Sequence, residues 1–159
     1  MHSDFQLAQV NVARLRAPLD DPQIKDFVDG LAPLNALAES SPGFVWRLQD
    51  DAGNATGVAY DPDPLLIVNL SVWQDITSLR AYAHSGPHLE YLKRRREWFA
   101  RLATPHVCLW WVEPGAYPSP TEAKARLRLL ETAGVSAAAF TFARVYTPEL
   151  TVLPASSRT

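Results

Sequence analysis

The stretch from Leu65 to Trp73 (LLIVNLSVW) constrains the fold more than any other part of the sequence. Its aliphatic composition predicts a strand, and side chains along a strand alternate between two faces. One face carries Ile67, Asn69, Ser71 and Trp73, while the other is wholly aliphatic. An amide and a hydroxyl inside a sheet need hydrogen-bond partners, which are each other, water or a ligand. We therefore expect the polar face to line an interior site.

The remaining elements surround this strand in a recognisable order. Alternation predicts further strands at 5–16, 44–48, 106–112 and 139–146, and apolar spacing and cap residues predict helices at 22–38, 75–83, 87–102 and 121–133. Pro33 lies inside the first helical pattern, so we expect a kink or break near Gly30. The order β-α-β-β-α-β plus an extra α-β predicts an α+β, ferredoxin-like fold, an antiparallel sheet with helices on one face.

Length and composition exclude several classes of protein. The 159 residues suit a single domain, predicted over 1–150, with a frayed tail over 151–159. One Cys rules out a disulfide scaffold, and neither a membrane span nor a signal peptide is apparent, so we expect a cytoplasmic protein. The net charge of -2 argues against a nucleic-acid partner. No phosphate-binding or dinucleotide motif is present, so NAD and ATP lack support.

Three stretches together resemble the DUF3291 family of bacterial proteins. They are AQVNVARL near the start, NLSVWQDITSLRAYAHSGPHLEYLKRRREWF in the centre and LWWVEPGAYPSPTEAKARLRLLETAGVSAAAFTF near the end. The wider resemblance is to the dimeric α+β barrel superfamily, in which two ferredoxin-like protomers pack their sheets into a barrel. This resemblance implies a homodimer. Members of that superfamily include cofactor-free antibiotic-biosynthesis-type monooxygenases and haem enzymes.

Two histidines flank a helix junction in the central stretch. His84 and His88 are separated by Ser85-Gly86-Pro87, and Pro87 is expected in the first turn of a new helix. The spacing does not make a zincin motif, because the helix is broken and a serine stands where the glutamate belongs. The functional interpretation makes His88 or His84 a general base, a hydrogen-bond partner of the substrate or an axial haem ligand, the axial ligand being His88 or else His84. The structural interpretation has His84 end a helix and His88 bond to the backbone.

Arg95 is expected on the inward face of the helix over 87–102. It lies four residues after Tyr91 and three before Trp98, both in the apolar stripe, while Arg94 can be solvated. An inward arginine must be paired, so it would bind a substrate carboxylate, a haem propionate or a structural acid. The other interpretation is that its long side chain extends to place the guanidinium in water.

The polar strand faces and the tryptophans define the predicted pocket. Asn11 and Gln9 share a face of the first strand, as Asn69, Ser71 and Trp73 do of the central one, and Trp46, Trp98 and Trp110 supply the apolar wall. Trp111 is expected in the core, and Cys108 as an inert buried thiol.

Three functions remain open. The resemblance implies a monooxygenase-like oxidoreductase that acts on an apolar or aromatic metabolite, with Asn11, Asn69, Trp73 or His88 positioning substrate or oxygen. The first alternative is a haem enzyme of the same fold. The second is a non-catalytic dimer that binds a hydrophobic metabolite.

Overall fold

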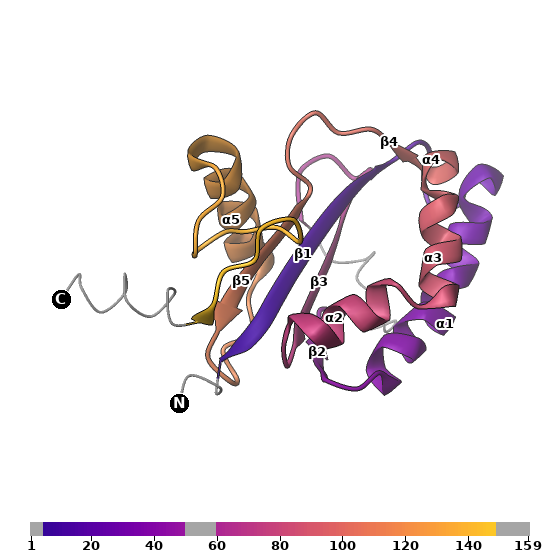
Figure 1. Ribbon diagram of the computed structural model, residues 1–159. Helices are drawn as coiled ribbons and strands as arrows, with labels where there is room; N and C mark the ends of the chain where they lie inside the picture. Colours follow the sequence, from indigo (N-terminus) through magenta and orange to yellow (C-terminus); the bar gives the residue numbers. More distant parts are fainter. Residues whose placement is uncertain (1–4, 50–59, 149–159) are drawn as a thin grey trace.

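The computed structural model describes residues 5–49 and 60–148. Its sheet is built around β1 (Gln6–Leu15), the strand in the middle of Figure 1. β3 (Leu66–Trp73) pairs with one edge of β1 and β5 (Val107–Val112) with the other, and β2 (Phe44–Arg47) adds outside β3. All these pairings are antiparallel. The predicted α+β, ferredoxin-like fold is confirmed, and the tail at 151–159 lies outside the described residues.

Helices cover both faces of this sheet (Figure 1). On one side lie α1 (Lys25–Ser40), α2 (Ile76–Ala83), α3 (Gly86–Lys93) and the short α4 (Arg95–Trp98). On the other side lies α5 (Pro120–Ala133), whose Ala123, Leu127 and Leu130 pack on the aliphatic sheet face. We call these the helix-layer face and the α5 face. The prediction of helices on one face only is wrong, because α5, the extra helix predicted from the sequence, covers the second face.

The helix boundaries follow from capping chemistry. Asp75 accepts a hydrogen bond from the Ser78 amide, and Ser119 accepts one from the Glu122 amide, so each caps the helix that follows it. A 3-10 turn, η2 (Pro22–Ile24), precedes α1 and is capped by Asp21. Pro33 does not end α1, which continues to Ser40.

Two parts of the predicted fold need correction. The segment predicted as a last strand at 139–146 forms only isolated bridges, and its Phe140 exchanges two backbone hydrogen bonds with Leu109 of β5. The helix predicted over 87–102 is shorter and broken, and its end is the two-residue strand β4 (Phe99–Ala100) beside β1.

Burial of the α5 face bears on the predicted homodimer. Ala8, Val10, Val72 and Trp110 on this face are all fully buried within one chain. The barrel dimer that the resemblance implies needs a sheet face that can meet the partner's sheet, and α5 covers this face within one chain. The homodimer stays a prediction.

Gly30 allows α1 and α3 to pack closely. A Cβ built on Gly30 would overlap the Tyr91 ring of α3, whereas one built on Gly86 would meet no atom within 4 Å. We expect Gly30→Ala to lower the free energy of unfolding by about 1–3 kcal/mol, the usual cost of overpacking. Urea unfolding of Gly30→Ala, with Gly86→Ala as the matched control, tests this. Equal stability of the two variants would contradict it.

Candidate functional site

The helix-layer face of the sheet carries two apolar clusters with a polar band between them. At one end Leu7, Trp73 and Leu109 pack with Leu79 of α2 and with Phe140. At the other end Leu15 packs with Trp98, Ile24 and neighbours from α1 and α3. The polar band consists of Gln9, Asn11, Asn69 and Ser71. It interrupts an apolar layer in the middle of the sheet, where continuous apolar packing would be the most stable arrangement.

Strand register brings the polar band together. Gln9 lies opposite Ser71, and Asn11 lies opposite Asn69, in the antiparallel pairing of β1 with β3. Gln9 Nε2 donates to Asn69 Oδ1 at 2.7 Å and to Ser71 Oγ at 2.8 Å. Trp73 Nε1 also donates to Ser71 Oγ, at 2.9 Å. These bonds satisfy the buried groups of the band and fix the side chains relative to one another.

Asn69 is the open end of the band. It is exposed although it lies on a central strand, while its neighbours Gln9 and Ser71 are 5% and 6% exposed. Its Oδ1 accepts from both Gln9 Nε2 and, at 3.4 Å, Asn11 Nδ2. The amide is therefore held with its oxygen inward, and its Nδ2 has no partner among the residues described. Asn69 offers N–H donors to a ligand that carries an acceptor oxygen.

His88 lies beyond Trp73 along a chain of aromatic rings. The Tyr82 ring stacks on Trp73 with ring centroids 5.2 Å apart, and the His88 ring lies 5.0 Å from Tyr82. The Tyr82 hydroxyl donates to the Leu34 carbonyl at 3.3 Å, and burial raises the pKa of Tyr82 to about 12. Tyr82 is therefore a neutral spacer that anchors α2 to α1 at physiological pH.

The protonation state of His88 follows from its surroundings. Burial lowers the pKa of His88, a hydrogen bond to Ala83 opposes this, and His84 lowers it further. His88 Nδ1 lies 2.9 Å from the Ala83 carbonyl oxygen, which can only accept, so Nδ1 carries the hydrogen. A neutral ring protonated at Nδ1 has its lone pair at Nε2, which can accept a proton.

The other predicted site residues lie elsewhere. His84 is exposed at the end of α2, with Nδ1 2.9 Å from the Arg80 carbonyl oxygen. Trp98 is on the same side of the sheet as the polar band but is fully packed among Phe27, Tyr91 and Phe99. Cys108 is buried, as predicted, and burial raises the pKa of its thiol to about 12, which favours the predicted inert thiol.

The pocket wall predicted from Trp46 and Trp110 is wrong, because both lie on the α5 face. Trp110 pairs with Ala8, which packs toward α5. In β2, Phe44 pairs with Trp73, but a bulge shifts the register so that Trp46 pairs with Val72. A bulge reverses the alternation of faces. Trp46 therefore stacks on Tyr117 instead of lying opposite Ser71 on the polar face, with the Trp46 and Tyr117 ring centroids 5.0 Å apart.

The inward position predicted for Arg95 is also wrong. α3 ends at Lys93, Arg94 leaves the helical conformation, and α4 begins at Arg95. This break rotates the following residues about the helix axis. Arg94 takes the inner place, 4.9 Å from the centre of the Trp98 ring and 2.8 Å from Asp26. Arg95 is exposed, and its Nη1 donates to the Leu92 carbonyl at 3.1 Å.

Other observations limit what the site holds. No group of three His, Cys, Asp or Glu side chains suited to a metal ion occurs in the described parts of the chain. None of the helices described is both long and apolar enough to cross a membrane. Sequence reasoning missed Tyr82 as the link between His88 and Trp73, because the relative placement of α2 and β3 is not visible in a local pattern.

A family model for a domain of unknown function, DUF3291, matches residues 6–154. The chain belongs to the DUF3291 family. No curated protein matches the sequence.

Several crystal structures are similar in fold. A Shewanella oneidensis protein matches with a TM-score of 0.51 and 13% identity, covering 69% of this chain and 92% of that one. A Mycobacterium tuberculosis protein matches with a TM-score of 0.49 and 13% identity, and the match covers 72% of this chain and 99% of that one. SnoaB, a cofactor-independent oxygenase from Streptomyces nogalater, matches with a TM-score of 0.46 and 17% identity. That match covers 70% of this chain and 96% of SnoaB. At these identities the likeness concerns the fold alone.

The buried part of the polar band can be tested through Ser71. Ser71→Ala leaves the Trp73 indole N–H and one Gln9 N–H without their acceptor in a buried environment. We expect the free energy of unfolding to fall by about 1–3 kcal/mol, the usual cost of an unsatisfied buried donor. Chemical denaturation of Ser71→Ala and of Ser40→Ala, an exposed serine, measures this. A loss no larger than that of Ser40→Ala would show that the network does not stabilise the fold.

His88 makes stability depend on pH. Its pKa is lowered in the folded state, so the unfolded chain binds more protons between the two pKa values. The contribution of His88 is therefore complete above the unfolded value, near 6.5, and is lost as the pH falls toward the folded value. We expect wild-type stability to decrease relative to His88→Asn between pH 7.5 and pH 5.5, because asparagine donates to Ala83 without titrating. Urea unfolding across this range tests it, with exposed His106→Asn as the control. A parallel pH profile of wild type and His88→Asn would refute it.

Proposed function

We propose that this protein is a cofactor-free, monooxygenase-like oxidoreductase that acts on an apolar or aromatic metabolite at the polar band. The observation that supports this most is the exposed, oriented amide of Asn69 in the middle of an otherwise apolar layer. A donor fixed by its own hydrogen bonds stabilises developing negative charge on a substrate oxygen without reorganising. Tyr82, which stacks on the buried Trp73, adds aromatic surface beside the band.

His88 is the proposed base. Its neutral ring and its Nε2 lone pair suit it to take a proton from an acidic C–H beside a carbonyl or phenol. The Nδ1 hydrogen bond to Ala83 holds the ring in the required tautomer. The Tyr82 ring lies between His88 and Trp73, so a substrate that reaches both His88 and Asn69 has to extend across Tyr82.

The overall reaction balances with molecular oxygen as the oxidant. Removal of the proton leaves a carbanion whose charge spreads through the conjugated rings of an extended substrate onto an oxygen at its far end, where the Asn69 N–H groups stabilise it. The carbanion reduces oxygen and bonds to it, giving a hydroperoxide once a proton returns. Loss of water then converts the original CH₂ group into a ketone, so that one oxygen atom enters the product and the other leaves as water. The substrate supplies all the electrons, and no external reductant is needed.

The residues fit the haem alternative less well. His88 Nε2 is a suitable axial ligand. The arginine expected beside a propionate, Arg95, instead lies exposed with its guanidinium on the Leu92 carbonyl. Optical absorption decides this alternative: a Soret band on titration with haemin, absent in His88→Asn, would replace the proposed function with a haem-dependent one.

Oxygen consumption tests the proposed function. With a panel of polyphenols and anthrones, we expect wild type to consume oxygen, and His88→Asn to lower kcat/KM by about 10²–10⁴-fold. Asn69→Ala should lower it by about 10²–10³-fold, as loss of one oxyanion donor does. His106→Asn is the matched histidine control.

Two outcomes separate the alternatives. Background rates in wild type and both variants would remove the oxygenase proposal. Tight binding of an aromatic metabolite without turnover, unaffected by His88→Asn, would identify a non-catalytic binding protein.

A further inference from the structure

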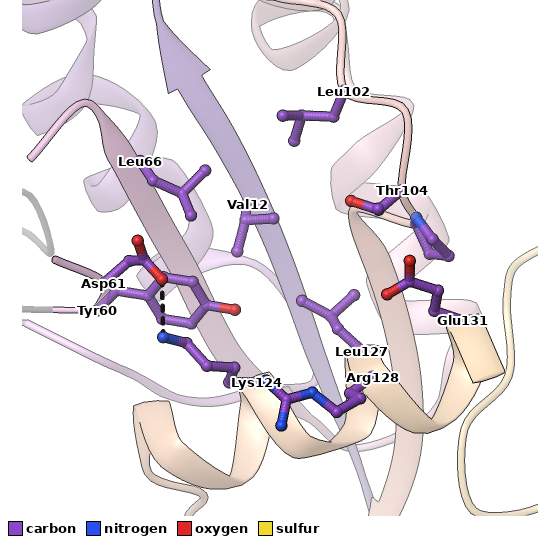
Figure 2. Close-up of a pocket in the computed structure, with 11 residues that line it drawn as sticks. Val12, Tyr60, Asp61, Leu66, Leu102, Thr104, Lys124, Leu127, Arg128 and Glu131 are labelled. Atoms are coloured by element: carbon purple, nitrogen blue, oxygen red, sulfur yellow. Dashed lines mark hydrogen bonds and ion pairs between the residues drawn. The ribbon is translucent and has the colours of Figure 1, made fainter. Parts of the chain in front are cut away.

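A pocket lies on the α5 face, away from the polar band. It has a volume of about 240 Å³ and is bounded by α5, by β1 and β3, and by the chain that leads into β5 (Figure 2). Its lining residues are Val12, Tyr60, Asp61, Leu66, Leu102, Thr104, Pro105, Lys124, Leu127, Arg128 and Glu131. Nothing in the proposed function uses this pocket.

The floor of this α5 pocket is aliphatic. Val12 of β1 and Leu127 of α5 are each 7% exposed, and Leu66 and Leu102 are partly exposed above them. Figure 2 shows these four side chains converging on one space. Partly exposed aliphatic groups around a hollow gain free energy when an apolar molecule covers them.

One side of the pocket supplies hydrogen-bond donors. Lys124 Nζ lies 2.9 Å from Asp61 Oδ1 and 4.8 Å from the centre of the Tyr60 ring. These two contacts hold the ammonium at the pocket, and an ammonium with three hydrogens can donate to a ligand as well as to Asp61. The Tyr60 hydroxyl points toward Val12 and Leu127 in Figure 2.

At the rim of the pocket, Asp61 and Lys124 form an ion pair, whereas Arg128 does not pair with an acidic side chain among the described residues. Asp61 is neutralised by Lys124 and accepts the Asp63 amide as well, at 3.1 Å, so it does not oppose an incoming anion. Arg128, one turn after Lys124, is exposed and has no side-chain partner among the described residues. The carboxylate of Glu131 lies on the opposite side, beside Thr104 (Figure 2).

We propose that the α5 pocket binds a small monocarboxylate with a short apolar body. Its carboxylate accepts from Lys124, Arg128 and the Tyr60 hydroxyl, and its apolar body covers Leu66 and Leu102. Glu131 at the far side repels a second acidic group, so the site selects against dicarboxylates. An alcohol of the same length lacks the charge-assisted bonds and binds more weakly.

Binding titrations with three probes of equal chain length test this site. We expect hexanoate to bind saturably, and hexan-1-ol and adipate to bind at least about tenfold more weakly, a difference equal to one charge-assisted hydrogen bond. Isothermal titration calorimetry or ligand-observed NMR measures all three. Absence of saturable hexanoate binding, or equal binding of the alcohol, would overturn the proposal.

Variants locate the bound probe. Arg128→Gln should weaken hexanoate about tenfold, and Thr104→Trp, which places an indole in the pocket mouth, should abolish binding. Thr121→Trp, exposed at the start of α5, is the matched control. Circular dichroism confirms that each variant folds. Hexanoate binding that survives in folded Thr104→Trp would overturn the assignment.

The α5 pocket is tested separately from the proposed function. Asn69→Ala alters the opposite face of the sheet, so hexanoate affinity should be unchanged in it whatever its effect on oxygen consumption. Loss of hexanoate binding in Asn69→Ala would place the carboxylate at the polar band and overturn the proposal.

Discussion

The pairing of Gln9 with Ser71 and of Asn11 with Asn69 is the constraint on which the site depends. These residues face each other across β1 and β3, and the Gln9 amide donates to both Asn69 and Ser71. A slip of the register by one residue would turn the whole set to the other face and bury unpaired amides among aliphatic side chains. The network therefore favours a single register, and that register is also what leaves the Asn69 amide nitrogen facing outward.

Local patterns predicted most of this arrangement. Alternation along LLIVNLSVW and along the first strand placed Asn69, Ser71, Trp73, Gln9 and Asn11 on shared faces, and all five do meet. The caps at Asp75 and Ser119 follow from chemistry within one helical turn. Information of this kind is contained in a few neighbouring residues, and a sequence displays it directly.

The wrongly predicted side-chain orientations lie where a break in a helix or a bulge in a strand shifts the alternation of buried and exposed positions. One turn residue at Arg94 exchanges the roles of Arg94 and Arg95, and one bulge in β2 separates the faces of Phe44 and Trp46. Trp110 is a different case, because β5 is apolar on both sides and only its register with β1 decides which side faces α5. The α5 pocket could not be predicted from local sequence patterns either, because Tyr60 and Lys124 meet only through tertiary packing.

The α5 face of the sheet mainly stabilises the fold, and the helix-layer face holds the polar groups of the candidate site. The polar band removes apolar contacts from the middle of the helix-layer face, and the α5 face compensates with a buried apolar layer that includes Val10, Leu70 and Val72. α5 is therefore needed for stability because the other face holds polar groups. A sheet-to-sheet dimer through the α5 face would require α5 to move away and uncover this layer. A homodimer compatible with this fold has to use a different surface.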